Sequence, residues 1–223
     1  MIELENIEFS YRKKMVLNQL SMEIVPGDFV AIAGSNGCGK STLLAILSGA
    51  LKPDYGSIRY YHQDALNDHR LFSKYIGYVP QENPLIPELS VKDNLKLWFQ
   101  GTKMEFNEEL NHGFLHLLDI ESYLNTPIRK LSGGMKKRVS IGCALSNHPP
   151  ILVMDEPSAA LDLLCKNDIH NYLSMYLKNG GTVIVTTHEE SELDLCNKLF
   201  VLKDGKLTQI SSSLRGKQLL NFF

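Results

Sequence analysis

A glycine-rich run close to the start of the chain has the residue types and the spacing of a phosphate-binding loop. It fits the pattern G-x-x-x-x-G-K-[ST] at every specified position. Glycines let successive backbone N–H groups curl around a phosphate, and the helix expected to begin near Lys40 adds the positive end of its dipole. Lys40 can reach the β- and γ-phosphates, and the hydroxyl of Ser41 suits a magnesium ion. The residues expected to bind the nucleotide are Gly34, Ser35, Asn36, Gly37, Cys38, Gly39, Lys40, Ser41 and Thr42.

Two acidic residues follow a second apolar run and could complete a site for nucleotide hydrolysis. Asp155 and Glu156 come directly after residues 151–154, whose side chains are all apolar. Asp155 would lie near the magnesium ion, and Glu156 is placed to polarise an attacking water molecule. Alone, such a pair would more often be two surface carboxylates. Together with the upstream phosphate loop, it favours a nucleotide hydrolase.

The elements that must position these residues are those of an α/β fold. Residues 29–33 form a continuous apolar run, which is typical of a strand buried on both faces, and this run leads through the glycines into a predicted helix. Further strands are predicted at 151–154, 182–186 and 199–202, with a helix over 162–177. Strand, helix and strand in this order predict a parallel sheet.

The middle of the chain differs in the spacing of its apolar residues. Residues 91–99 and 110–118 carry apolar side chains three and four positions apart, which indicates helices. Near the end, Asp204 and Gly205 predict a β-hairpin, so the last strand should be antiparallel. The sequence therefore predicts an α/β core that is interrupted by a helical insertion.

Composition narrows the class of protein. The chain has 223 residues, of which 43% are hydrophobic and 22% are charged, an ordinary globular composition. Its formal net charge of −2 argues against a nucleic-acid partner. The four cysteines lack metal-ligand spacing and are expected to be reduced thiols. No apolar run reaches the roughly 18 residues needed to cross a bilayer, and the start lacks signal-peptide features, so we expect a soluble, cytoplasmic chain.

A third element begins another predicted helix and reads Leu131-Ser132-Gly133-Gly134-Met135. Ser132 can act as the N-cap of this helix, and the two glycines leave its first N–H groups open to an anion. With the phosphate loop before it and the acidic pair after it, this element resembles the signature of ABC-type ATPases, the nucleotide-binding subunits of ATP-driven transporters. The resemblance covers essentially the whole chain.

Shorter motifs extend this resemblance. Tyr11 lies where the family has an aromatic residue that stacks on adenine, and Gln81 matches the glutamine that touches magnesium and the attacking water. His188 matches the histidine that contacts the γ-phosphate, and residues 159–162 resemble the loop that contacts a second subunit. Taken singly, each of these would more often be an ordinary packed or solvated residue. Their common order and spacing favour the functional interpretation.

The resemblance implies a role for each motif. Two subunits would clamp head to tail around two ATP molecules, and each site would combine the phosphate loop of one chain with the signature of the other. The catalytic residues would be Glu156, His188, Gln81 and Lys40, the magnesium ligands Ser41, Gln81 and Asp155, and the residues acting across the dimer Ser132, Gly133 and Gly134.

The fold that the resemblance implies is an α/β P-loop NTPase core with a mainly parallel sheet, an antiparallel β subdomain and an inserted α-helical subdomain. One ABC-type ATPase domain would span residues 1–223, with the RecA-like core and the antiparallel subdomain in 1–82 and 149–223 and the helical subdomain in 83–148. The implied activity is hydrolysis of Mg-ATP coupled to transport through a separate transmembrane permease subunit. The chain would lie on the cytoplasmic face of the membrane, paired with an identical or related second subunit.

One position departs from the family pattern. Met135 stands where the signature usually ends in glutamine, but the preceding serine and glycines are intact, so we expect catalysis to survive. Met135 with the basic residues 136–138 after it resembles exporter-type members, which move drugs, antibiotic peptides or lipids; these basic residues are expected to form a solvated face. The alternative function is a soluble ABC-type ATPase in a role such as iron–sulfur assembly. A regulatory subunit that binds ATP without turnover is disfavoured because Lys40, Asp155, Glu156 and His188 are intact.

Overall fold

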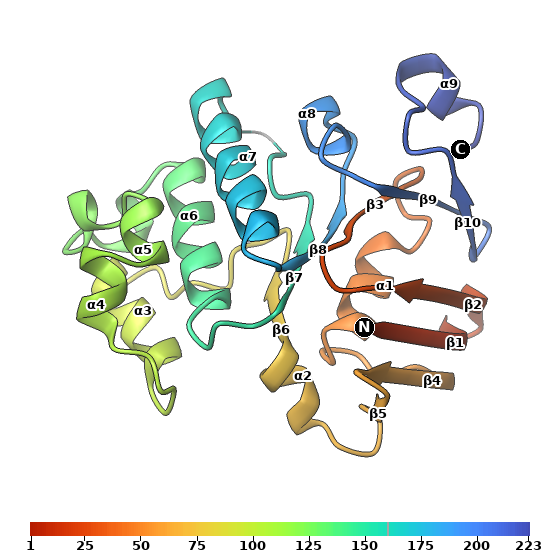
Figure 1. Ribbon diagram of the computed structural model, residues 1–223, viewed down its shortest axis with the longest axis horizontal. Helices are drawn as coiled ribbons and strands as arrows, with labels where there is room; N and C mark the ends of the chain where they lie inside the picture. The colour runs from red at the N-terminus through yellow and green to blue at the C-terminus, as the bar shows by residue number, and fades with distance from the viewer. Residues whose placement is uncertain (160) are drawn as a thin grey trace.

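The computed structural model describes residues 1–159 and 161–223 and contains two sheets surrounded by helices (Figure 1). Ala160, which belongs to the predicted inter-subunit loop, lies outside the described residues. The larger sheet has the strand order β10, β9, β3, β8, β7, β6, and every neighbouring pair except β9 and β10 is parallel. Its strands are β3 (Phe29–Ala33), β6 (Ile76–Val79), β7 (Ile151–Asp155), β8 (Thr182–Thr186), β9 (Lys198–Lys203) and β10 (Lys206–Ile210).

The smaller sheet is antiparallel and has the order β2, β1, β4, β5. The two sheets confirm the predicted fold class, including the mainly parallel core, the antiparallel β part and the hairpin at Asp204 and Gly205. The strands of this sheet are β1 (Ile2–Tyr11), β2 (Lys14–Ile24), β4 (Tyr55–Tyr60) and β5 (Gln63–Asp64).

The larger sheet is buried on both faces because its central strands alternate between two apolar cores. On one face, Val30 and Ile32 of β3 pack in the core that also holds the inner side chains of β1, β2 and helix α1 (Lys40–Leu47). On the other face, Phe29 and Ala31 pack in the core that holds the helical segment and α7 (Leu163–Lys178). A one-residue slip of β3 would exchange these two sets and place side chains of the wrong size in each core, which close packing makes unfavourable.

The segment between β6 and β7 is helical. The helix predicted over 110–118 is two short helices. The side chain of Glu109, in the first of them, folds back to the backbone N–H of Phe114 at the start of the second. It fills the space beside Gly113, where a Cβ would lie 2.0 Å from Glu109 Oε2.

No helix among the described residues is long and apolar enough to cross a bilayer. The remaining helices are α2 (Arg70–Tyr75), α3 (Val91–Phe99), α4 (Phe106–Asn111), α5 (Phe114–Leu117), η1 (Glu121–Tyr123), η2 (Ile128–Lys130), α6 (Gly133–Ala144), α8 (Glu190–Leu193) and α9 (Gly216–Leu220).

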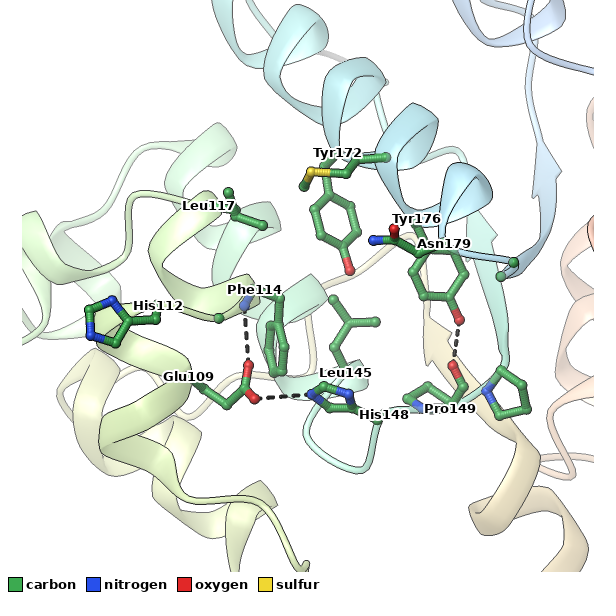
Figure 2. Close-up of a pocket in the computed structure, with 15 residues that line it drawn as sticks. Glu109, His112, Phe114, Leu117, Leu145, His148, Pro149, Tyr172, Tyr176 and Asn179 are labelled. Atoms are coloured by element: carbon green, nitrogen blue, oxygen red, sulfur yellow. Dashed lines mark hydrogen bonds and ion pairs between the residues drawn. The ribbon is translucent and has the colours of Figure 1, made fainter.

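A buried carboxylate joins this helical segment to the core. Figure 2 shows Glu109 below a pocket of about 420 Å³ whose opposite wall is formed by Tyr172 and Tyr176 of α7. Glu109 Oε2 accepts a hydrogen bond from the backbone N–H of Phe114 at 3.1 Å, and Oε1 lies 3.1 Å from His148 Nε2. Glu109 therefore caps α5 and also holds the loop that leads into β7.

We predict that Glu109→Ala lowers the free energy of unfolding by about 1–3 kcal/mol, because it leaves a buried backbone donor without its acceptor. Glu109→Gln keeps a side-chain oxygen and should lose less. Urea denaturation followed by circular dichroism measures both, with the exposed Glu108→Ala as control. Equal stability of the Glu109→Ala and Glu108→Ala variants would contradict this role.

Candidate nucleotide-binding site

The glycine-rich loop joins the end of β3 to the start of α1, as the sequence predicts. Two of its glycines are required by the fold itself, since both have positive φ angles: 150° at Gly34 and 111° at Gly39. A Cβ on Gly34 would lie 2.4 Å from the carbonyl oxygen of Leu202, and one on Gly39 would lie 2.7 Å from Val16 Cγ1. The loop is therefore held tightly against β9 at Gly34 and against β2 at Gly39, with no room for a larger side chain at either position.

Lys40 lies across this loop and is buried. Its Nζ donates hydrogen bonds to the carbonyl oxygens of Gly34 at 2.7 Å and Ser35 at 3.2 Å. Ser41, the next residue, is exposed at the start of α1. The loop thus presents an ammonium group, a hydroxyl group and the N-terminus of a helix on one surface, which is the chemistry that binds phosphate.

The two carboxylates at the end of β7 are held by a residue of the neighbouring strand. The Thr186 hydroxyl donates to Asp155 Oδ1 at 2.5 Å and accepts from the backbone N–H of Glu156 at 3.0 Å. The Thr186 carbonyl oxygen also accepts from this N–H, at 3.1 Å. Glu156 has a positive φ of 45°, a conformation that costs energy for a non-glycine residue and that these two hydrogen bonds stabilise.

Gln81 meets Glu156 although they are far apart in the sequence. Gln81 Nε2 donates to Glu156 Oε2 at 3.1 Å, because β6 and β7 are parallel neighbours whose carboxyl ends lie at the same edge of the sheet. The amide oxygen of Gln81 takes no part in this contact. The structure therefore brings together two residues that the sequence assigned to catalysis.

His188 follows β8 at the same edge of the sheet. Burial lowers the pKa of its imidazole, the positive charge of Lys40 lowers it further, and Glu156 acts in the opposite direction. The ring is therefore mostly neutral at pH 7, with one nitrogen that donates and one that accepts. A neutral imidazole can donate a hydrogen bond to a phosphate oxygen without a second full positive charge beside Lys40.

The signature residues lie at the start of α6. Ser132 caps this helix, as predicted: its Oγ accepts from the backbone N–H of Met135 at 3.2 Å. Ser132 and Gly133 are exposed, and a Cβ on Gly133 would have no neighbour closer than 3.8 Å. Gly134 is different, because a Cβ there would lie 2.2 Å from Cys165 Sγ. The small size of Gly134 is thus a packing requirement of this chain, whereas that of Gly133 is not.

The prediction that residues 136–138 form a solvated face is wrong for two of them. Lys137 is only 4% exposed and donates to the carbonyl oxygens of Pro80 and Gln81, both at 3.2 Å. Arg138 pairs with Asp168 of α7. Both partners come from distant segments, so no local pattern reveals these contacts.

A pocket of about 320 Å³ lies beside the glycine-rich loop, and its lining differs in part from the sequence prediction. Tyr11 does not line it; this side chain is 53% exposed and packs edge-on against Phe9, with ring centroids 4.9 Å apart. Neither do the signature residues of the same chain, and Figure 1 shows α6 and the glycine-rich loop on opposite sides of α7. The lining residues are Lys14, Met15, Val16, Ser35, Asn36, Gly37, Cys38, Lys203, Asp204, Gly205 and Phe223.

Comparison with known proteins gives one consistent result. Residues 17–159 match the family model described as ABC transporter. The chain is 37% identical over 209 residues to the Nod factor export ATP-binding protein I of Rhizobium etli, covering 92% of this chain and 66% of the relative. The protein of the same name from Sinorhizobium fredii is 36% identical over 208 residues, covering 92% of this chain and 61% of the relative. The chain thus spans about two thirds of the length of these relatives or slightly less.

A solved structure agrees with these sequence relatives. It is a dimeric post-hydrolysis state of an ATP-binding cassette bound to ADP and Pi. The two chains superpose with a TM-score of 0.84 and 31% identity, covering 97% of this chain and 100% of that chain.

The two signature glycines should respond differently to substitution. We predict that Gly134→Ala lowers the free energy of unfolding by about 1–3 kcal/mol through overpacking against Cys165, and that adding Cys165→Ala restores most of the loss. Gly133→Ala, whose new methyl group meets open space, should change it by less than about 1 kcal/mol. Thermal or urea unfolding of the three variants measures this, and equal loss for Gly133→Ala and Gly134→Ala would count against the packing assignment.

Proposed function

This chain belongs to the ABC transporter family, as its motifs predicted, and we propose that it is the ATP-binding and ATP-hydrolysing subunit of a transporter. One observation carries this proposal: the carboxyl edge of the larger sheet gathers Lys40, Glu156, Gln81 and His188. A cation for phosphate, a carboxylate for water and a neutral imidazole are together the groups that phosphoryl transfer to water requires.

The proposed hydrolysis divides the work between these residues. Lys40 and the backbone N–H groups of the glycine-rich loop bind the β- and γ-phosphates and stabilise the charge that develops there. Glu156 accepts a proton from the attacking water, and Gln81 orients both the carboxylate and the water. His188 donates to a γ-phosphate oxygen.

Magnesium is part of the proposal, and the donors near the loop suit it. Ser41, Asp155 and Gln81 offer a hydroxyl, a carboxylate and an amide oxygen, which are hard ligands of the kind Mg²⁺ prefers. No three His, Cys, Asp or Glu side chains gather into a metal site anywhere in 1–159 or 161–223, so phosphate oxygens would complete the coordination. When bound, the ion would neutralise charge on the phosphates.

We further propose that two copies form each complete site. Ser132 and Gly133 lie at the exposed N-terminus of α6, where helix N–H groups attract an anion. They do not line the loop pocket of their own chain, so the anion they bind would be the γ-phosphate held by a partner subunit. The dimer of the related cassette supports this arrangement.

The membrane subunit has a candidate docking groove beside Gln81. This groove, of about 550 Å³, is lined in part by Tyr78, Pro80, Pro84 and Trp98, and the side chain of Trp98 is 46% exposed. We propose that it receives a short, largely apolar cytoplasmic helix of the permease, because its lining includes the exposed Trp98 and also Pro80, the residue next to Gln81. Movement of that helix would then reach Glu156 through a single hydrogen bond.

Export is the proposed direction of transport, since the relatives reported above carry the word export in their names. The subunit would work on the cytoplasmic face of the membrane, where ATP is available. None of the reported relatives favours the alternative of a soluble iron–sulfur assembly ATPase.

We predict that Glu156→Gln keeps ATP binding but lowers turnover by about 10²–10⁴-fold, since the amide cannot accept the proton of the attacking water. The unhydrolysed ATP should then hold two copies together. Phosphate release gives the rate, and sedimentation velocity with and without ATP gives the dimer fraction.

Glu121→Gln, which changes an exposed carboxylate of η1, is the matched control and should behave as the parent protein. Parental turnover in the Glu156→Gln variant would remove the general-base assignment. A variant that binds ATP, turns over slowly and stays monomeric would remove the two-copy site.

A further inference from the structure

The segment after β10 returns to the glycine-rich loop. This segment, residues 211–223, which we call the tail, includes the short helix α9, and Figure 1 shows α9 and the end of the chain on the side of the loop between β3 and α1. The tail is tethered through a buried side chain: Leu219 is only 5% exposed and belongs to the core that contains Leu193 and Val201.

Arg215 supplies a second tether. Its Nη2 donates to the carbonyl oxygen of Leu193 at 2.7 Å, and its Nε donates to Asp194 Oδ1 at 3.2 Å. Its Nη1 donates within the tail, to the carbonyl oxygen of Ser212 at 2.6 Å. These bonds fix the start of the tail against the end of α8 and so direct the residues after α9 toward His188.

Phe223 makes the contacts that matter for the site. Its ring packs edge-on against the imidazole of His188, with centroids 5.7 Å apart and planes inclined by 69°. Its carbonyl oxygen accepts from Lys203 Nζ at 2.7 Å. Together with residues 35–38 of the glycine-rich loop, it lines the pocket of about 320 Å³. The neighbouring Phe222 is 42% exposed and lines no part of this pocket.

An aromatic ring therefore lies beside the phosphate loop, next to the histidine expected to contact the γ-phosphate. In the proposed two-copy site, the exposed start of the partner's α6 would approach the γ-phosphate held by the loop, and so this same surface. Two groups cannot occupy this surface together. The tail and the partner subunit must exclude each other.

We propose that the surface around residues 35–38 and His188 has two alternative occupants: Phe223 of the tail within one chain, and the Ser132–Gly134 turn of a second copy. This inference rests on the proposed function. Phe223 is half-buried at the edge of the core that holds Leu219, and it meets the loop surface through one aromatic edge on His188 and one exposed hydrogen bond from Lys203. These contacts are few enough for ATP that links two copies to displace Phe223 while Leu219 and Arg215 keep the rest of the tail in place. Phe223 would thus set the ATP concentration at which copies associate, and it would keep His188 covered until they do.

The test uses Phe223→Ala in the Glu156→Gln background, where ATP-driven dimers accumulate. We expect the ATP concentration for half-maximal dimerisation to fall about two- to tenfold, the range that corresponds to loss of one aromatic contact. The matched control is Phe222→Ala, which removes a neighbouring aromatic side chain without exposing the loop and should leave this concentration unchanged. An unchanged or higher value for Phe223→Ala would overturn the proposal.

A second measurement needs no dimer. Cys38 lines the same pocket as Phe223, so the rate of its alkylation by N-ethylmaleimide without nucleotide, read by peptide mass spectrometry, reports whether the tail covers the loop. Phe223→Ala should raise this rate and Phe222→Ala should not. If Glu156→Gln fails to dimerise with ATP, both the proposed two-copy site and the claim that a second copy binds this surface are contradicted. If Cys38 is labelled at equal rates in the Phe223→Ala and Phe222→Ala variants, only the claim that Phe223 covers the loop is contradicted.

Discussion

The site depends on one constraint: the carboxyl ends of parallel strands must meet at one edge of a sheet that is buried on both faces. β3, β8, β7 and β6 are consecutive neighbours in that sheet, so the loops after them come together without any local sequence signal. The Thr186 hydroxyl fixes the positions of the two acidic residues after β7, because it donates a hydrogen bond to Asp155 and accepts one from the backbone N–H of Glu156. The apolar cores on the two faces of the sheet hold the strands themselves in place.

Much of this arrangement could be predicted because the informative signals are local. The strand, glycine turn and helix around Lys40 occupy one continuous stretch, and so do the apolar run ending at Asp155 and the cap at Ser132. Such features depend on backbone conformation and strand burial, which neighbouring residues largely determine. The structure confirms the elements that they predict. The helix predicted at 110–118 is divided in two, and the Glu109 carboxylate accepts the backbone N–H of Phe114 where the second part begins.

What could not be predicted depends on contacts between distant segments. Lys137 looks like one member of a basic run, and only the position of the loop carrying Pro80 and Gln81 shows why it is buried. Gly134 and Gly133 look equivalent in the sequence, yet Cys165 constrains only the first. Thr186 carried a weak signal, a polar residue at the end of an apolar run, and Phe223 carried none. The adenine role of Tyr11 stays a prediction, since its ring lies on Phe9 outside the loop pocket.

The burial of Lys137 has a mechanical consequence. Burial lowers the pKa of its ammonium group, whose hydrogen bonds go to the two carbonyl oxygens of the Gln81 loop. If α6 moved without that loop, the buried ammonium group of Lys137 would lose both hydrogen bonds, at a cost of several kcal/mol. The helix that begins with the signature and the loop that carries Gln81 should therefore move together, as a single unit, when either of them is displaced.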